Sequence, residues 1–209
     1  GGGSCEKRQR MGRLGVDVAR EGDDRSAIAT KIGRDCTMPL KVFRDLDGPQ
    51  LGMQVLMYAN ELKAKGIPRV YINLDYTGVG ASPYDWLKDK VQHLNKVISA
   101  SQSTNPQRWA NKRAEMWDKM RDFIRDDGVI FKSEELAEDL CIPEKLIDQK
   151  GRLLLESKDS MKRRNMNSPD TADALALCFA IPIQEYIEDD SWRHQRHNRS
   201  KTIRDPYAS

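Results

Sequence analysis

The fold of this 209-residue chain is decided by one stretch near its middle, Arg69-Val70-Tyr71-Ile72-Asn73-Leu74-Asp75. Its nearly continuous apolar run is typical of a buried strand. Before it, Leu51, Val55, Tyr58 and Leu62 recur at helical spacing and predict a helix that opens at Gly48-Pro49. After it, two glycines lead into a second helix predicted over 83–90. A strand between two helices is typical of an α/β domain.

Strands dominate the chain before this unit, and helices dominate after it. Two apolar runs on either side of a polar turn predict a hairpin. The predicted strands cover residues 14–19, 26–32, 40–46, 69–75 and 91–98, with a short one at 153–155. Further helices are predicted over 107–125, after Ser133 and from Ser168-Pro169-Asp170, with proline at the first helical position, while 158–164 is a basic turn or helix. The order predicts a mixed sheet with helices on its faces.

Composition excludes several classes of protein. Hydrophobic residues make up 38% and charged residues 32%, and the formal net charge is only +3, so charge alone does not indicate a nucleic-acid-binding protein. No apolar stretch approaches the roughly 20 residues that cross a bilayer, and no signal peptide is recognisable. The four cysteines are isolated, without a Cys-x-x-Cys pair, so we expect reduced thiols in a cytosolic protein.

The two ends of the chain differ in composition from the middle. Residues 1–12, which begin with a Gly-Gly-Gly-Ser run, are interpreted as a linker and charged lead-in. Residues 13–187 are expected to form the folded domain. Residues 188–209 are expected to be a polar, basic tail, because Lys and Arg are frequent there and apolar residues are rare. His194 and His197 in this tail lack a third ligand and predict no metal site.

Acidic side chains stand at four places where an apolar element would not naturally carry a charge. Asp17 lies inside the first strand, and Asp75 closes the central strand at its carboxyl end, where ligand and metal sites collect in α/β sheets. Asp170 and Asp173 are three residues apart near the start of the last helix and so point to nearly the same side. If that helix crosses the sheet near the first and fourth strands, four carboxylates converge.

Converging carboxylates repel one another and stay ionised only beside cations. Oxygen ligands without His or Cys favour Mg²⁺ or Mn²⁺ over zinc, and two such ions about 4 Å apart support phosphodiester cleavage. A structural role is open to each acid taken alone: Asp17 as a hydrogen-bonded turn residue, Asp75 as a strand-end cap and Asp170 as a carboxylate at the start of a helix. The pattern therefore predicts a metal site without excluding these roles.

Basic residues near the acids supply candidate DNA contacts, namely Arg20, Arg25, Lys158, Lys162, Arg163 and Arg164. Each alone is typical of a solvated surface, but the group beside the acids favours phosphate binding. Gly78 and Gly80 raise the alternative of a nucleotide site, which we do not expect because the third glycine and a Walker lysine are missing. Thr77 is interpreted as a cap or a substrate contact.

Five blocks of the sequence resemble one known family in their order along the chain. The blocks are Gly15-Val16-Asp17-Val18-Ala19 with Gly22-Asp23-Asp24-Arg25, Asp75-Tyr76-Thr77-Gly78-Val79-Gly80, Asn111-Lys112-Arg113-Ala114-Glu115-Met116-Trp117, Glu156-Ser157-Lys158 and Ser168-Pro169-Asp170-Thr171-Ala172-Asp173-Ala174-Leu175. Together they are similar to the C-terminal nuclease domain of the large terminase subunit of tailed bacteriophages, over about residues 13–182.

This resemblance implies an RNase H-like fold with a mixed five-stranded sheet, and a metal-dependent endonuclease that cuts concatemeric phage DNA in the cytoplasm of a bacterial host. It implies two Mg²⁺ or Mn²⁺ ions held by Asp17, Asp75 and one or both of Asp170 and Asp173, with Lys158 near the scissile phosphate. The implied partners are double-stranded DNA, the terminase ATPase domain, the small terminase subunit and the portal protein, with no membrane. No Walker loop is present, so we expect no ATP hydrolysis by this chain.

Two other functions stay open from the sequence. A Holliday-junction resolvase of the same fold would dimerise and prefer branched DNA. A non-catalytic module would use the acids structurally and bind DNA or the portal protein through its basic tail.

Overall fold

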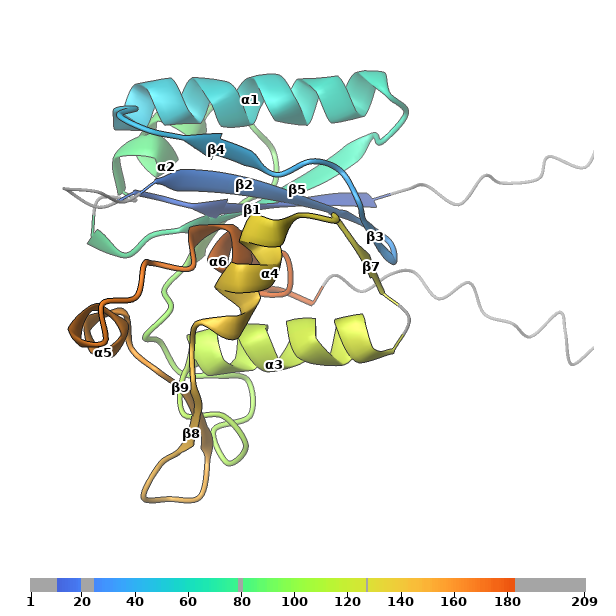
Figure 1. The fold of residues 1–209 in the computed structure, drawn as a ribbon. Helices are drawn as coiled ribbons and strands as arrows, with labels where there is room; N and C mark the ends of the chain where they lie inside the picture. The colour runs from blue at the N-terminus through green and yellow to red at the C-terminus, as the bar shows by residue number, and fades with distance from the viewer. Residues whose placement is uncertain (1–10, 20–24, 79–80, 127, 183–209) are drawn as a thin grey trace, which may run out of the picture.

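The structure is a computed structural model that describes residues 11–19, 25–78, 81–126 and 128–182. Arg20, most of the predicted lead-in and the predicted tail lie outside the described residues. Within the described part, seven strands form one mixed sheet in the order β6-β5-β1-β2-β3-β7, and β4 also pairs with β2 (Figure 1). The strands are β1 Met11–Asp17, β2 Ser26–Ile32, β3 Asp35–Cys36, β4 Lys41–Phe43, β5 Arg69–Asp75, β6 Leu94–Val97 and β7 Val129–Ile130.

Helices cover both faces of the sheet, and a small hairpin projects away from it (Figure 1). On one face lie α1 and α2, and on the other lies α6, with α3 and α4 packed outside it. The helices are α1 Gly48–Ala64, α2 Ala81–Leu87, α3 Lys112–Arg125, α4 Glu134–Cys141, α5 Lys158–Arg163 and α6 Asp170–Leu177, and the hairpin consists of β8 Lys145–Ile147 and β9 Leu153–Leu155. None of the helices in the described ranges combines the length and the apolar character that a membrane span requires.

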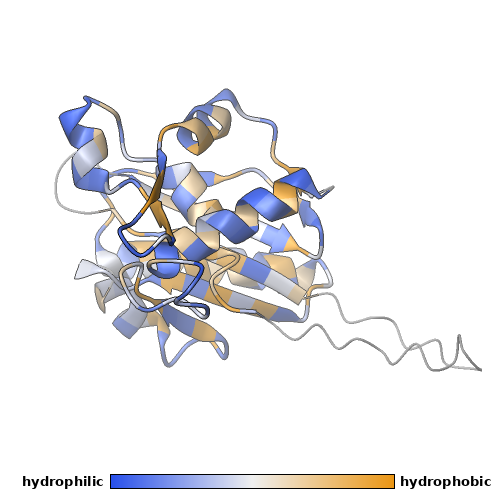
Figure 2. Ribbon diagram, turned by 90° about the horizontal axis from the view of Figure 1, so that it is seen from below, coloured by the Kyte–Doolittle hydropathy of each residue, from blue (hydrophilic) through white to orange (hydrophobic). Residues whose placement is uncertain are grey.

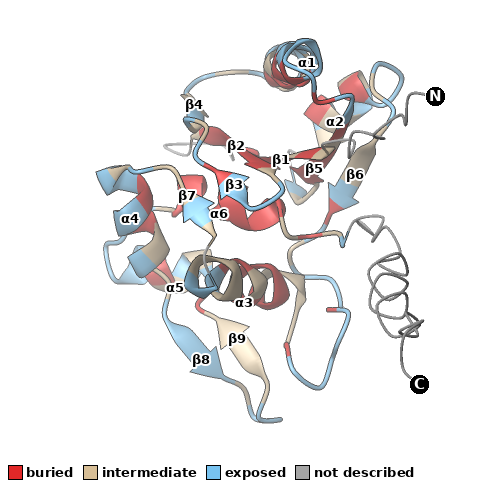
Figure 3. Ribbon diagram, turned by 90° about the vertical axis from the view of Figure 1, so that its right-hand side faces the viewer, coloured by how far each residue is buried: buried red, intermediate tan, exposed pale blue. Residues whose placement is uncertain are grey.

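Two apolar clusters, one on each face of the sheet, hold these layers together. One is built from β1, β5 and α1, and includes Leu14, Ile72 and Val55. The other lies between the sheet, α6 and α3, and includes Leu175 and Met120. All eight residues of α6 are buried, so this helix is the centre of its layer (Figure 3). The outer helices carry both apolar and hydrophilic residues, as expected for elements with one face in water (Figure 2).

The predicted α/β class and mixed sheet are confirmed, and the strands predicted over 26–32 and 69–75 have the predicted bounds. The sheet has seven strands in the described ranges rather than five, because β3 and β7 are only two residues long and carry no periodic signal. The first strand begins and ends earlier than the predicted 14–19, since β1 spans Met11–Asp17, and it includes Met11 and Gly12 of the predicted lead-in. The strand at 153–155 is confirmed, but it pairs with β8 outside the main sheet.

Two predicted helix starts were wrong. α3 begins at Lys112 rather than at 107, because the Asn111 side chain accepts a hydrogen bond from the Ala114 amide and caps the helix there. Ala110 lies outside the helix, and its amide donates to the Leu153 carbonyl oxygen. Pro169 is the N-cap residue of α6 and not its first helical residue, which is Asp170.

Gly15 lets α6 pack directly on β1. A Cβ atom at this position would lie 1.9 Å from the Ala174 carbonyl oxygen and 3.0 Å from the Cys178 amide nitrogen, both of which are backbone atoms. Neither atom can rotate away as the end of a side chain can. The close contact between β1 and α6 therefore depends on glycine at position 15.

We expect Gly15→Ala to lower the free energy of unfolding by about 1–3 kcal/mol, because α6 must shift to admit the methyl group. Gly12→Ala in the same strand is the matched control, since its nearest contact is a side-chain atom, Cγ2 of Ile67, at 3.1 Å. Urea unfolding measures both variants. Equal stability of Gly15→Ala and the parent would contradict the direct packing of α6 on β1.

Candidate functional site

Strand pairing places Asp17 and Asp75 at the same end of the sheet. β1 and β5 are parallel, with Val16 opposite Leu74, so the next residue of each strand lies at the same level. Side chains alternate along a strand, so Asp17 lies on the face of Gly15, which contacts α6. Both carboxylates are buried, with 3% and 7% of each residue exposed. Two acids from different strands therefore meet below the sheet, on the α6 side.

Hydrogen bonds fix α6 against β5 beside these acids. The Asn73 side chain, two residues before Asp75, donates to the Leu177 carbonyl oxygen of α6 at 2.8 Å. The Asn95 side chain of β6 donates in turn to the Asn73 side-chain oxygen at 3.0 Å. Since Asn73 is 1% exposed, this is a buried polar link from β6 through β5 to the last helix. This link holds the last residue of α6 against β5, and so helps to position the whole helix, with its two acids, relative to Asp75.

Lys158 places a positive charge between the strand and helix acids. Its ammonium nitrogen lies 3.7 Å from Oδ2 of Asp17 and 3.1 Å from Oδ2 of Asp173. Only 21% of the Lys158 side chain is exposed. The aliphatic part of the Lys158 side chain is thus largely buried, and its ammonium group neutralises part of the negative charge of the acidic cluster.

Two residues of α3 orient Asp173. Oδ1 of Asp173 accepts hydrogen bonds from the Arg113 guanidinium at 3.2 and 3.3 Å and from the Trp117 indole N–H at 2.8 Å. Arg113 also donates to the Glu156 carbonyl oxygen at 2.6 Å, just before α5. With one oxygen held by α3, the other oxygen of Asp173 faces Lys158.

Asp170 has a different set of neighbours from Asp173. Its Oδ2 atom lies 3.5 Å from Nε of Arg25, and Arg25 also pairs with Glu135 of α4. Between the two helix acids, Thr171 donates to Oδ2 of the buried Asp139 from both its amide and its hydroxyl. α4 therefore braces the first turn of α6 at the point where its acids project.

Burial and mutual repulsion shift the pKa values of the carboxyl groups in this acidic cluster. Burial raises the pKa of the Asp17 carboxyl, Lys158 opposes the rise, and Asp173, Asp75 and Asp170 add to it, so that the pKa lies well above its usual value. Burial also raises the pKa of Asp75, against hydrogen bonds from Thr77. For Asp173, burial is outweighed by Arg113, Lys158 and Trp117, and its pKa is lowered. Among the described residues, Lys158, Arg113 and Arg25 supply positive charge beside these carboxylates.

A further buried carboxylate, Glu115, shows the contrasting case of an acid that is fully paired. It accepts hydrogen bonds from the Thr104 amide and hydroxyl, both at 2.8 Å, and it pairs with Lys112 and Lys119. Burial alone would raise the pKa of Glu115, but Lys119, Thr104 and Lys112 together lower it to about 2. Glu115 thus anchors the loop before α3, outside the acidic cluster.

We expect Glu115→Gln to lower the free energy of unfolding by about 2 kcal/mol at neutral pH, because charged acceptors form stronger hydrogen bonds than neutral ones. Since the pKa of Glu115 is lowered from 4.5 to about 2, its stabilisation is complete above pH 4.5 and is lost as the pH falls toward 2. Urea unfolding of parent and variant across this range measures the loss, with the exposed Glu138→Gln as control. A stability difference that stays constant down to low pH would contradict this role.

The predicted DNA-contacting residues separate into two groups. Lys162 and Arg163 of α5 are exposed and make no ion pair with another described residue, so they remain predicted phosphate contacts. Arg25, Lys158 and Arg164 pair with acids, and they also remain predicted phosphate contacts. Arg164 in addition donates to the Ile142 carbonyl oxygen. Arg20 lies outside the described residues.

Sequence reasoning missed Arg113 and Trp117 as members of the site. Both belong to a block that carries the family resemblance, but the amphipathic pattern placed Trp117 in the core and Arg113 on the surface. The signal that was available is their four-residue spacing, which puts both on one side of α3. The brace formed by Asp139 and Thr171 was also missed, because nothing local connects two residues 32 positions apart.

The donor set of the cluster suits a hard divalent cation, since it consists of carboxylate oxygens. Within the described ranges, no three acids, histidines or cysteines are already arranged to hold a metal ion. Lys158 lies among the acids that would do so, and its ammonium group stands where positive charge is required. The residues present therefore fit a divalent cation.

These observations define a class: an RNase H-like α/β domain with acids at the ends of two adjacent strands and at the start of a helix packed across them. Three solved structures are similar to the chain in fold. They are the nuclease domain of the large terminase subunit gp2 of bacterial virus Sf6, a mutant of that domain with manganese, and the large terminase nuclease of thermophilic phage G20c with bound magnesium.

The Sf6 domain is 18% identical with a TM-score of 0.63, and the match covers 84% of this chain and 89% of that one. The manganese-containing mutant is 19% identical with a TM-score of 0.62, and the match covers 83% of this chain and 89% of that one. The G20c nuclease is 11% identical with a TM-score of 0.56, and the match covers 83% of this chain and 82% of that one. No protein-family model and no curated protein sequence matches the chain. The chain thus has the fold of phage large-terminase nuclease domains, which confirms the fold expected from the resemblance.

Proposed function

We propose that this chain is a divalent-metal-dependent DNA endonuclease that cuts concatemeric phage DNA during genome packaging. The observation that carries the proposal is the buried cluster of Asp17, Asp75, Asp170 and Asp173 at one end of the sheet. A buried cluster of like charges costs folding free energy and is typical of a site where function requires it. Neighbours of the same fold include nuclease structures with manganese and magnesium, which supports this choice of chemistry.

In this proposal, Asp17, Asp75 and Asp173 hold two Mg²⁺ or Mn²⁺ ions, and Asp170 supports them from the first turn of α6. Bound there, the ions would supply Lewis-acid activation of water and neutralise charge on the scissile phosphate. The protein's own part is to keep the acids ionised and aligned. Arg113 and Trp117 fix one oxygen of Asp173, and the Thr77 amide donates to Oδ1 of Asp75 at 3.0 Å.

Lys158 has two tasks in this proposal. Without a divalent cation, its ammonium group neutralises Asp17 and Asp173. When those acids bind metal, the flexible four-carbon stem lets the ammonium group swing toward the phosphate of the DNA backbone. Without metal, burial lowers the pKa of Lys158 but Asp17, Asp173 and Asp170 raise it more, so the ammonium group that pairs with these acids stays protonated.

DNA reaches the cluster along α5 in this proposal. Lys162 and Arg163 project from the helix that carries Lys158 and are free to contact phosphates. Such contacts neutralise the backbone without reading bases, so we expect little sequence specificity and a strong dependence on salt. Further proposed partners are the terminase ATPase domain, the small terminase subunit and the portal protein, in the cytoplasm of a bacterial host.

The direct test is cleavage of supercoiled plasmid by the purified chain in Mn²⁺, in Mg²⁺ and with a chelator. We expect nicked and linear products with either metal and none with the chelator. Linear duplex and four-way junctions of equal length then separate a packaging endonuclease from a junction resolvase. Cleavage with the chelator, or cleavage restricted to junctions, would overturn the proposal.

A further inference from the structure

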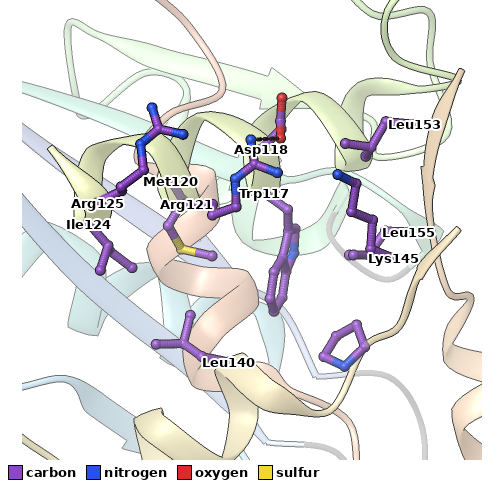
Figure 4. Close-up of a pocket in the computed structure, with 11 residues that line it drawn as sticks. Trp117, Asp118, Met120, Arg121, Ile124, Arg125, Leu140, Lys145, Leu153 and Leu155 are labelled. Carbon is purple, nitrogen blue, oxygen red and sulfur yellow. Dashed lines mark ion pairs between the residues drawn. The ribbon is translucent and has the colours of Figure 1, made fainter.

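A cavity of about 420 Å³ lies between α3, the end of α4 and the β8–β9 hairpin (Figure 4), and the four acids of the cluster are not among its lining residues. Its walls are largely apolar, and they include Trp117 and Ile124 from α3, Leu140 from α4 and Leu155 from β9. A cavity of this size accommodates one or two large side chains and is within the range of ligand pockets.

Basic side chains surround the cavity. Arg121 and Arg125 flank it on α3, and Lys145 flanks it on β8 (Figure 4). Among the described residues, the two arginines pair with acids of the same helix or its cap, and the exposed Lys145 has no ion pair. The cavity therefore favours an occupant that is apolar at its centre and acidic at its edges.

One segment of this chain has that chemistry. Directly after the described residues, the sequence continues with Ile183-Gln184-Glu185-Tyr186-Ile187-Glu188-Asp189-Asp190. Its three apolar residues are spaced i, i+3 and i+4, so they share one face of a helical turn, and its other residues include four acids. The segment is acidic although the tail that follows it is basic.

The described chain ends close enough to the cavity for this segment to reach it. The Phe179 ring packs against the Phe123 ring of α3, with ring centroids 5.2 Å apart. Phe123 is next to Ile124, which lines the cavity. The seven residues from Phe179 to Tyr186 span up to roughly 24 Å when extended, whereas a helix with its side chains is about 10–12 Å across.

We propose that residues 183–190 dock in this cavity, with Tyr186 and Ile187 against its apolar walls and the acids beside Lys145, Arg121 and Arg125. The docked segment covers the Trp117 ring, whose N–H group donates to Asp173. Docking thus stiffens the residue that orients one acid of the cluster. The docking itself stands whether or not the chain cleaves DNA.

The test is hydrogen exchange, measured by mass spectrometry on the full chain. The double variant Tyr186→Ala/Ile187→Ala removes the apolar anchors without touching the described fold. We expect amides of the β8–β9 hairpin and the end of α4 to exchange about fivefold faster or more, as loss of roughly 1 kcal/mol of local stability would give. Tyr207→Ala, at a second tyrosine of the tail, is the matched control and should change nothing.

A charge variant of the cavity tests the same contact from the other side. Lys145→Glu should also speed exchange of the hairpin, and adding it to the double variant should produce no further increase, because both remove one interaction. Equal exchange in the parent and the double variant would overturn the proposal. So would additive effects, or an effect of Tyr207→Ala as large as that of the double variant.

Discussion

We expect Asp75→Asn to lower the rate of the proposed metal-dependent plasmid cleavage by about 10³-fold, because one of the converging carboxylates loses its charge and several kcal/mol of charge stabilisation go with it. The amide keeps the shape of the side chain, and its oxygen can still accept the Thr77 amide hydrogen bond at Oδ1. Burial raises the pKa of Asp75, so removing this charge also relieves an unfavourable burial. The thermal unfolding temperature should therefore stay the same or rise.

Cleavage is measured in Mn²⁺ beside a variant of an acid outside the site. Asp85→Asn serves as this control, because Asp85 is exposed on α2 and, among the described residues, its ion pair is with Lys88 just after that helix. The control should cut like the parent. If Asp75→Asn cuts plasmid as fast as the parent, Asp75 does not belong to the proposed site. If the variant fails to fold, Asp75 has a structural role instead.

Lys158→Ala makes the stability of the protein depend on divalent cations. Breaking a buried ion pair by removing one partner costs about 3–5 kcal/mol, and here Asp17 and Asp173 both lose the ammonium group. A cation bound to those acids replaces the lost charge, and at a hundred times its Kd a ligand adds about 2.7 kcal/mol of stability. The variant should unfold at a lower temperature than the parent without metal and recover in Mn²⁺.

The matching experiment is a Mn²⁺ titration followed by thermal unfolding of the parent, Lys158→Ala and Lys162→Ala. Lys162 lies on the same helix but is exposed, so its removal should leave the response to Mn²⁺ unchanged. Lys158→Ala should respond at an Mn²⁺ concentration at least about tenfold lower than the parent, because no ammonium group competes for the acids. If the unfolding temperature of Lys158→Ala does not change with Mn²⁺ concentration, the result would contradict a cation site and favour a non-catalytic module.

Long periodic elements were predictable from the sequence, and so were the acids that interrupt them. The apolar run that ends in Asp75 needed no tertiary information, since the run predicts a strand and the charge marks its end. The start of α3 was harder to predict from the sequence, because Trp109 and Ala110 continue the apolar spacing of the helix. Only the Asn111 cap and the distant pairing of Ala110 with Leu153 set the true start.

The hydrogen bonds and ion pairs within the site could not be predicted, because they join residues that are far apart in the sequence. Arg113 and Trp117 meet Asp173 across 60 and 56 positions, and no local pattern records such pairs. The contacts of Arg25 with Asp170 and Glu135 were likewise beyond local patterns. Its phosphate contact, predicted from its position beside Asp17 in sequence, stays a prediction.

The packing of α6 beneath β1 and β2 has a consequence for synthesis of the protein. Arg25 and Asp170 meet although 145 positions separate them, so the acids of the first strand are made long before those of the last helix. At translation rates of about 5–20 residues per second, the interval is roughly 7–30 s. A nascent chain on the ribosome therefore carries an incomplete cluster, and the proposed cutting activity can begin only after the last helix has emerged.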